Sequence, residues 1–303
     1  MNHQILFFGP EPYRVGKEIS TKSVKDGDII ITADLLAKNK VNDNFKYINY
    51  NVALDRPPFL RKPKFEYDLE KITLFNLKYK ILCYNRRTHI HRLILVYYLL
   101  NNENVKKNSL ISIACKTYQN EFNFSKFFGL LKNKKEIQNI FNFYKNLNED
   151  VKIDECNLFS NLGIIFSEDA YQKSFISLVT ETNIEKDVLF TSEKTYKPIF
   201  AQQPFLILGN TGTLKYLKSI GFKTFDKWFD ESYDDEIEFE NRLKKILSVV
   251  EYICKLSLED LTKIRIEMNE ILIHNYKHFL TIDIAPSEIK LFGINQKKEK
   301  KYL

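Results

Sequence analysis

Cysteine is scarce in this chain: the 303 residues include four, and no two of them form a Cys-x-x-Cys pair. Neither a zinc ribbon nor a thioredoxin-like redox motif is therefore present. Cysteines that lie far apart and form no such framework are typical of a reducing compartment. We therefore expect a cytoplasmic protein. The four residues are Cys83, Cys115, Cys156 and Cys254.

Long apolar runs are also missing. No stretch approaches the roughly 18 consecutive apolar residues that a membrane-spanning helix needs. The first residues, MNHQILFFGPEPYR, contain a short apolar run without a basic segment ahead of it, which is not typical of a signal peptide. These two absences predict a soluble protein with no transmembrane segment.

Glycine-rich phosphate loops are absent too, because no glycine is followed by lysine and then serine or threonine. The turn LGNTGT at 208–213 follows an apolar run but contains only two glycines, so kinase or ATPase chemistry has little support. We expect this turn to let the backbone come close to a ligand.

Metal-binding motifs are equally weak. Asp26-Gly27-Asp28 has the Asp-x-Asp form of metal-dependent sugar transferases, but it precedes a predicted strand, so we interpret it as a turn. His274 and His278 are four residues apart, yet no glutamate follows His274 as a zinc protease motif requires. The sequence therefore predicts no bound metal and no cofactor.

Positive charge is what the chain has in excess: 46 lysines and arginines against 39 acidic residues give a net charge of +7. Such an excess favours anionic partners, which include nucleotide phosphates, nucleic acid and membrane surfaces. The alternative is that the lysines reflect an AT-rich coding genome, because phenylalanine (24) and tyrosine (17), which such a genome also favours, are abundant as well. Charge alone does not decide between these interpretations.

The first part of the chain predicts a small lobe. Short apolar runs that end at turns predict strands at Ile5–Phe8, Ile29–Thr32 and Tyr47–Ala53. A basic stretch with three prolines, DRPPFLRKPKFEYD, follows and is the best candidate for a linker, at about 55–78. We assign 1–77 to this N-terminal lobe, with the linker at its end.

The second part, 78–280, predicts a larger α/β lobe. Strands alternate with helices there, which is typical of a parallel sheet covered on both faces. In such sheets ligands bind beyond the carboxyl ends of the strands. We expect two helices within 117–150, one helix from Ser257 to about Phe279, and a charged tail at 281–303. The expected strands are Tyr79–Tyr84, Leu110–Ala114, Phe175–Val179 and Phe205–Leu208; helices are expected at Arg92–Leu100 and Leu214–Ile220.

A basic segment, NRRTHIHR, directly follows the first strand of this lobe. Its arginines fall where the strand ends and a helix begins. The start of a helix exposes unpaired amide groups and the positive end of the dipole. Arg86, Arg87 and Arg92 are therefore candidates for binding a diphosphate, and the alternative is a solvated basic turn.

A second segment, FTSEKTYK, repeats this arrangement, with Thr191 or Ser192 as the cap of the helix that follows. A carboxylate at a helix start, such as Glu193, can accept both hydroxyls of a ribose, and Lys194 can meet a phosphate. The alternative is that Glu193 only complements the helix dipole. Pro198 predicts that this helix is short or kinked.

The segment SFISLVTETNIEKDVLFTSEKTYKPIFAQQPFLILGN resembles the donor-binding segment of the α1,3-fucosyltransferase family. Glu181 stands at the first acidic position of that segment, and Thr182-Asn183 replaces the usual Asn-Ser. Glu193-Lys194 stands at the Glu-Lys position, with Ser192 in place of threonine, and Pro204–Gly209 matches the strand that follows. The resemblance covers about 79–225, is specific at 175–210, and implies an apolar, aromatic strand at 188–190.

The resemblance implies a GT-B architecture, with two Rossmann-like lobes facing each other across a cleft. It also implies metal-independent, inverting transfer of a sugar from a nucleotide-diphosphate sugar to a saccharide hydroxyl of a glycan. Nucleic acid is a less favoured partner. The donor-binding residues would be Arg86, Arg87, Arg92, Glu181, Asn183, Ser192, Glu193, Lys194, Tyr196 and Lys197.

The catalytic base would come from the N-terminal lobe, because the acceptor would bind there and one carboxylate must take its proton. Glu11 is our first candidate, and Asp34, Asp55 and Glu66 are alternatives. Two other functions remain open. One is a glycosyltransferase that acts on hydroxymethylated DNA bases, and the other is a non-catalytic module that binds nucleotide sugars.

Overall fold

The computed structural model describes residues 5–8, 29–32, 46–49, 51, 54, 77–116, 124–151, 153 and 168–282. The proline-rich linker up to residue 76, the Asp26-Gly27-Asp28 turn and all but the first residues of the predicted tail lie outside this set. The same holds for the base candidates Glu11, Asp34, Asp55 and Glu66.

Three short strands form the N-terminal sheet: β1 (Ile5–Phe8), β2 (Ile29–Thr32) and β3 (Lys46–Asn49). They are parallel and lie in chain order, with Ile5 opposite Ile29 and Ile29 opposite Lys46. The first two strands are confirmed as predicted. The third begins one residue earlier than we predicted and ends at Asn49, four residues before the predicted end.

Four parallel strands form the second sheet, in the order β5-β4-β6-β7. Most of their residues are buried, which explains why they are nearly continuous apolar runs instead of alternating ones. The predicted parallel sheet of an α/β protein is thereby confirmed. The strands are β4 (Tyr79–Cys83), β5 (Ser109–Ile111), β6 (Ser174–Thr180) and β7 (Phe205–Leu208).

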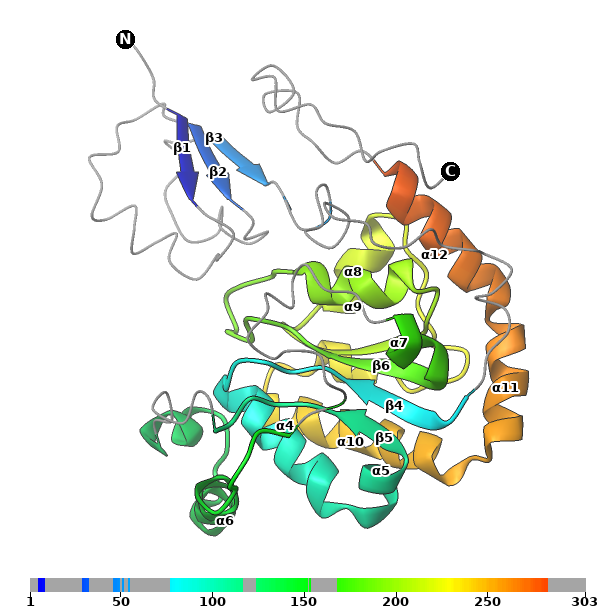
Figure 1. Cartoon of the computed structure of the whole chain (residues 1–303). Coiled ribbons are helices and arrows are strands. Elements are labelled where there is room, and N and C mark those ends of the chain that lie inside the picture. Colours follow the sequence, from blue (N-terminus) through cyan, green and yellow to red (C-terminus); the bar gives the residue numbers. More distant parts are fainter. Residues whose placement is uncertain are drawn as a thin grey trace.

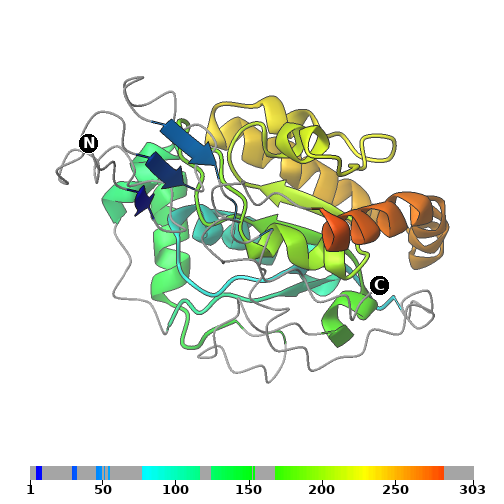
Figure 2. The same ribbon diagram turned by 90° about the horizontal axis from the view of Figure 1, so that it is seen from above.

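Helices cover both faces of this sheet (Figure 1). Helices α4 (Ile90–Asn101) and α10 (Phe239–Lys255) lie on one face, and α8 (Glu193–Phe200) lies on the other, against β6 and β7. In both views α11 and α12 lie at the end of the molecule opposite β1–β3 (Figures 1 and 2). The other helices are α5 (Glu103–Lys107), α6 (Lys134–Lys145), α7 (Glu168–Lys173), α9 (Thr213–Ser219), α11 (Leu258–Glu267) and α12 (Asn269–Thr281), with 3₁₀ turns η5 (Phe124–Gly129) and η6 (Ser232–Asp235).

Three predictions about local structure were wrong. Within 117–150, the first predicted helix is only the 3₁₀ turn η5 in the described part. The single helix predicted from Ser257 to Phe279 is two helices that meet at the buried Met268; the apolar pattern continues across the break and so does not reveal it. Residues 188–190 are irregular instead of a strand.

The order of the strands defines where a ligand is expected. From β4 the chain crosses to β5 on one side, and it then returns to β6 on the other side of β4. The β4–β6 pair is therefore a topological switch point, where loops leave in opposite directions and open a crevice at the carboxyl edge. Asn85 links these two strand ends, because it accepts a hydrogen bond from the hydroxyl of Thr180.

No helix in the described ranges is long and apolar enough to cross a membrane.

Candidate functional site

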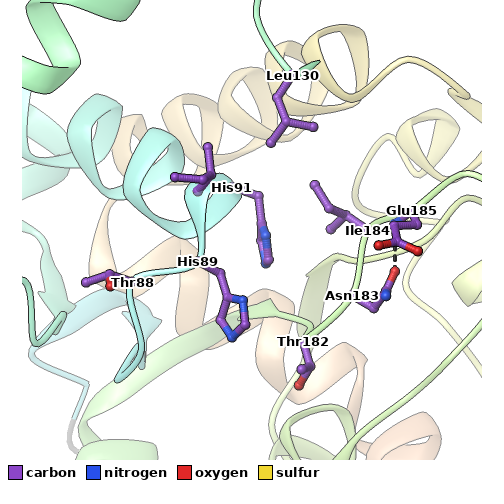
Figure 3. A pocket seen from close by; sticks show the side chains of 9 residues that line it. Thr88, His89, His91, Leu130, Thr182, Asn183, Ile184 and Glu185 are labelled. Carbon is purple, nitrogen blue, oxygen red and sulfur yellow. Dashed lines mark hydrogen bonds between the residues drawn. The ribbon is translucent and has the colours of Figure 1, made fainter. Parts of the chain in front are cut away.

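A pocket of about 580 Å³ lies at the switch point (Figure 3). One wall comes from the turn after β4 and the start of α4, the opposite wall from the loop after β6, and a further contact from Leu130. Its volume falls in the range of sites for small molecules, roughly 300–1,000 Å³. The lining residues are Thr88, His89, Ile90, His91, Leu130, Thr182, Asn183, Ile184 and Glu185.

The start of helix α4 opens onto this pocket. Its cap residue is His89, and neither a capping side-chain hydrogen bond nor an acidic side chain occupies its first turn. Within the described ranges, the backbone amides of Ile90 and His91 form no hydrogen bond. Unpaired amides and the positive end of the helix dipole make this wall of the pocket suited to an anion.

Two other helices that start at this edge of the sheet, α8 and α9, are closed by the chain itself. Asp234 accepts hydrogen bonds from the amides of Leu214 (2.9 Å) and Lys215 (3.0 Å), so it occupies the start of α9. Glu181 and Ser192 occupy the start of α8 in the same way. Of these three helix starts, α4 is the one left open to a ligand.

Glu181 is completely buried, and four donors surround its carboxylate. Oε1 accepts from the amide of Ser192 (2.9 Å) and the hydroxyl of Thr195 (2.6 Å). Oε2 accepts from the hydroxyl of Ser192 (2.6 Å) and the amide of Thr182 (3.1 Å). Glu181 therefore fastens the loop after β6 to helix α8, and its oxygens are engaged within the chain.

The backbone of Glu181 is held from the other side of the switch point. Its carbonyl oxygen accepts from His91 Nε2 (2.8 Å) and from the guanidinium of Arg92 (3.1 Å). Burial lowers the pKa of His91 well below 6.5, so the ring is neutral and presents Nδ1 as an acceptor. Burial also lowers the pKa of Arg92 to about 10. Arg92 thus ties α4 to the end of β6 from a buried position.

The predicted pair Glu193 and Lys194 opens helix α8, with Ser192 as the cap. Lys194 Nζ lies 2.8 Å from Glu193 Oε1 and 3.3 Å from the hydroxyl of Thr182, a residue that lines the pocket. Burial raises the pKa of Glu193, but attraction to Lys194 and Lys197 outweighs burial and leaves that pKa lowered. The Glu193 carboxyl group is therefore ionised, and the pair lies beside the pocket, which it reaches through the contact of Lys194 with Thr182.

Helix α8 has eight residues with Pro198 inside it, which confirms that this helix is short. Of the other predicted residues, Asn183 lines the pocket, whereas Arg86 is half-buried and Arg87 exposed in the turn after β4. Tyr196 is fully buried, and its ring stacks on Phe279 at 5.9 Å between centroids.

Lys197 is buried one turn beyond Glu193, and burial lowers its pKa to about 8. Between pH 8 and 10.5 Lys197 holds fewer protons in the folded than in the unfolded chain, so its own contribution to stability rises with pH. Burial raises the pKa of Cys83 to about 12 and that of Cys254 to about 11, and these thiols lower stability over the same range in any variant that keeps them. We therefore expect the difference in the free energy of unfolding between the wild type and Lys197→Met to shift in favour of the wild type on the order of 1 kcal/mol from pH 8 to 9.5. Urea denaturation of both proteins checks this, and an equal pH dependence in the two would show that Lys197 is not the titrating group.

The turn after β7 approaches a side chain of the chain itself. A Cβ at Gly209 would lie 3.2 Å from the hydroxyl of Thr213 and 3.3 Å from Cβ and Cγ of Glu181, so a side chain there would crowd both residues. Gly212 takes the left-handed conformation (φ 78°) and donates to the carbonyl of Asp234. We predicted that the backbone of this turn comes close to a ligand; in the structure Gly209 comes close to Glu181 and Thr213.

Sequence reasoning missed most residues that line the pocket. Thr88, His89 and His91 belong to the segment that we selected for its arginines, and Thr182 and Glu185 belong to the segment that we selected for Glu181 and Asn183. We predicted that the helix starts at Arg92, but it starts at Ile90. The correct start would have pointed to Thr88, His89 and His91 as residues beside the helix N-terminus. No local signal points to Leu130, which reaches the pocket from the segment between η5 and α6 (Figure 3).

In the part of the chain that the structure describes, no group of three or more His, Cys, Asp or Glu side chains is arranged to hold a metal ion. His274 and His278 instead face the end of α9, where their Nε2 atoms bond to the carbonyls of Gly221 (2.9 Å) and Ile220 (2.6 Å).

Comparison with known proteins gives no relative: no family model, no curated protein and no solved structure matches the chain.

Proposed function

We propose that the chain is a glycosyltransferase that moves a sugar from a nucleotide-diphosphate sugar to a saccharide hydroxyl, with inversion and without a metal. The observation that carries the proposal is the pocket between β4 and β6, where the open start of α4 faces the loop that leads to Glu193 and Lys194. The resemblance of 175–210 to α1,3-fucosyltransferases supports the same reaction class and a GT-B arrangement of the two sheets.

The walls of the pocket suggest how a donor would bind. The amides of Ile90 and His91 would hold the diphosphate, and Lys194 would neutralise part of its charge. The hydroxyl of Thr182 and the carboxylate of Glu193 would hold ribose hydroxyls. The apolar side chains in the pocket, Leu130 and Ile184 with Ile90, would pack against the flat base.

The reaction that follows is a single displacement. The acceptor oxygen forms a bond to the anomeric carbon while the bond from that carbon to the phosphate oxygen breaks. The acceptor proton passes to a carboxylate, for which Glu11 remains our first candidate. The departing diphosphate gains negative charge, and the helix amides and Lys194 stabilise it at that moment.

A thermal-shift screen of nucleotide diphosphates and nucleotide sugars tests the proposal. A ligand at 100 times its dissociation constant should stabilise the protein by about 2.7 kcal/mol. Release of the free nucleotide in the presence of a saccharide acceptor then tests catalysis. Binding without release would favour a non-catalytic module, transfer to hydroxymethylated DNA would favour the base-modifying enzyme, and no stabilisation by any nucleotide would end the proposal.

Activity should survive EDTA. The sequence has no Asp-x-Asp pair at a strand end, and the charge of the leaving group can be met by Lys194 and the start of α4. Turnover should stay within about twofold of the untreated rate, because no step depends on a bound cation. Complete loss with EDTA that manganese restores would overturn the metal-independent mechanism.

Ile90→Pro should weaken binding of a nucleotide diphosphate about tenfold or more, since it removes one amide that would donate to phosphate. Proline suits the first position of a helix, and His89 already has the extended conformation (φ −61°, ψ 140°) that a following proline requires. Calorimetric titration of both Ile90→Pro and Ile90→Ala separates the amide from the side chain. Equal affinity of the two variants would remove the α4 amides from the site.

A further inference from the structure

Asn51 connects the N-terminal sheet to the start of helix α8. It lies two residues beyond the end of β3 and is 3% exposed. Its amide nitrogen donates to the hydroxyl of Thr191 (2.6 Å), the carbonyl of Thr191 (3.2 Å) and the hydroxyl of Tyr196 (3.2 Å). A single side chain thus meets three oxygen atoms that belong to a segment 140 or more residues away.

Further contacts hold the residues on each side of these hydrogen bonds in place. The side-chain oxygen of Asn51 accepts from the amide of Leu54 (3.2 Å), and Leu54 is fully buried in the core of the four-stranded unit. Across the contact, the hydroxyls of Thr191 and Tyr196 lie 2.6 Å apart, and the ring of Tyr196 stacks on Phe279 of α12. The segment after β3 is therefore anchored by directed hydrogen bonds and by an apolar side chain.

We propose that Asn51 is a positioning residue that couples the N-terminal sheet to the ligand site. Thr191 directly precedes Ser192, whose amide and hydroxyl fasten Glu181, and Glu193 and Lys194 come next. Holding the carbonyl and hydroxyl of Thr191 fixes where this segment starts. The part of the proposal that concerns ligand binding rests on the proposed function.

Coupling of this kind is reciprocal. If the docked Asn51 favours the arrangement of residues 191–195 that binds a ligand, then the ligand must favour docking of the segment after β3 by the same factor. A leucine or alanine in place of Asn51 would fill or vacate the space but would leave buried oxygens of Thr191 and Tyr196 with one donor fewer.

Hydrogen exchange of the ligand-free protein tests the contact of Asn51 with Thr191 and Tyr196 without reference to any activity. In Asn51→Ala, amides of residues 191–196 should exchange about tenfold faster or more, and amides of β5 should be unchanged. Asn51→Asp keeps the oxygen that accepts from Leu54 but loses the bonds that Asn51 donates, and it should raise the exchange rates at 191–196 as Asn51→Ala does. Because aspartate nearly fills the space of asparagine, this variant shows that the effect does not come only from the cavity left by alanine. The control is Asn102→Ala, which removes the cap of α5 at the other edge of the sheet. Exchange at 191–196 that stays at the wild-type rate in both Asn51 variants would overturn the proposal.

A double-mutant cycle with Thr191→Val and a binding measurement complete the test. The effect of the double variant on the unfolding constant should be about fivefold smaller than the product of the two single effects, because both substitutions remove the same hydrogen bond. A nucleotide diphosphate found to bind the wild type should bind Asn51→Asp about fivefold more weakly, and Asn102→Ala equally well. If no nucleotide binds the wild type, the proposed function fails. Hydrogen exchange and the double-mutant cycle still test whether Asn51 positions residues 191–196. Full additivity together with unchanged affinity would overturn the role of Asn51.

Discussion

Replacing Glu181 with alanine should lower the free energy of unfolding by about 3–5 kcal/mol, which is the largest effect that we expect from a single substitution. The variant leaves four donors in a buried place without their acceptor: two amides and the hydroxyls of Ser192 and Thr195. It also removes the charge that stabilises the buried guanidinium of Arg92. Urea denaturation measures the difference.

Two further variants provide reference values for this loss of stability. Thr195→Val removes one of the four donors and should cost about 1 kcal/mol. Glu259→Ala removes an exposed carboxylate that pairs with Lys263, and it should change stability by less than about 0.5 kcal/mol. A loss below about 1 kcal/mol in Glu181→Ala would mean that Glu181 does not fasten α8.

Replacing Lys194 with alanine should weaken binding of a nucleotide-diphosphate donor by about 1.5–3 kcal/mol, or ten- to a hundredfold, while the fold stays intact. The ammonium group lies 3.3 Å from the hydroxyl of Thr182, which lines the pocket, and would contact the phosphates. Glu193→Ala should also weaken binding, because it removes the proposed acceptor of the ribose hydroxyls and the observed partner of Lys194. Calorimetric titration measures both affinities.

The matched control is Lys186→Ala, which removes a lysine of the same loop region that pairs with Glu238 at the surface. Its donor affinity should differ from that of the wild type by less than about twofold. The assignment of Glu193 and Lys194 would not survive wild-type affinity in both of their alanine variants, provided that circular dichroism shows them folded.

Much of the fold could be predicted from local sequence. Short apolar runs that end at turns predict strands, and Phe205–Leu208 and Ile29–Thr32 therefore appear where the sequence predicts them. Ser257 caps a helix as expected, with the amide of Asp260 at 3.0 Å from its hydroxyl. The segments after β4 and β6 were identified as binding segments because polar residues follow a strand end, and the pocket lies between them.

What the sequence could not supply were contacts between distant residues. Glu181 was predicted to contact a donor, but whether a carboxylate faces a ligand or four donors of its own chain depends on tertiary packing. Leu130 in the pocket and Asn51 against Thr191 depend on it as well. The break between α11 and α12 falls at a buried Met268 that fits the apolar pattern of either one helix or two.

The central claim is that an anionic nucleotide binds at the switch point between β4 and β6. Hydrogen exchange with and without a saturating nucleotide diphosphate tests it most directly, because the start of α9, closed by Asp234, serves as an internal reference. We predict slower exchange at residues 88–91 and 182–195 and no change at 213–218. Slower exchange confined to 213–218, or none at either wall of the pocket while the nucleotide is bound, would contradict the claim.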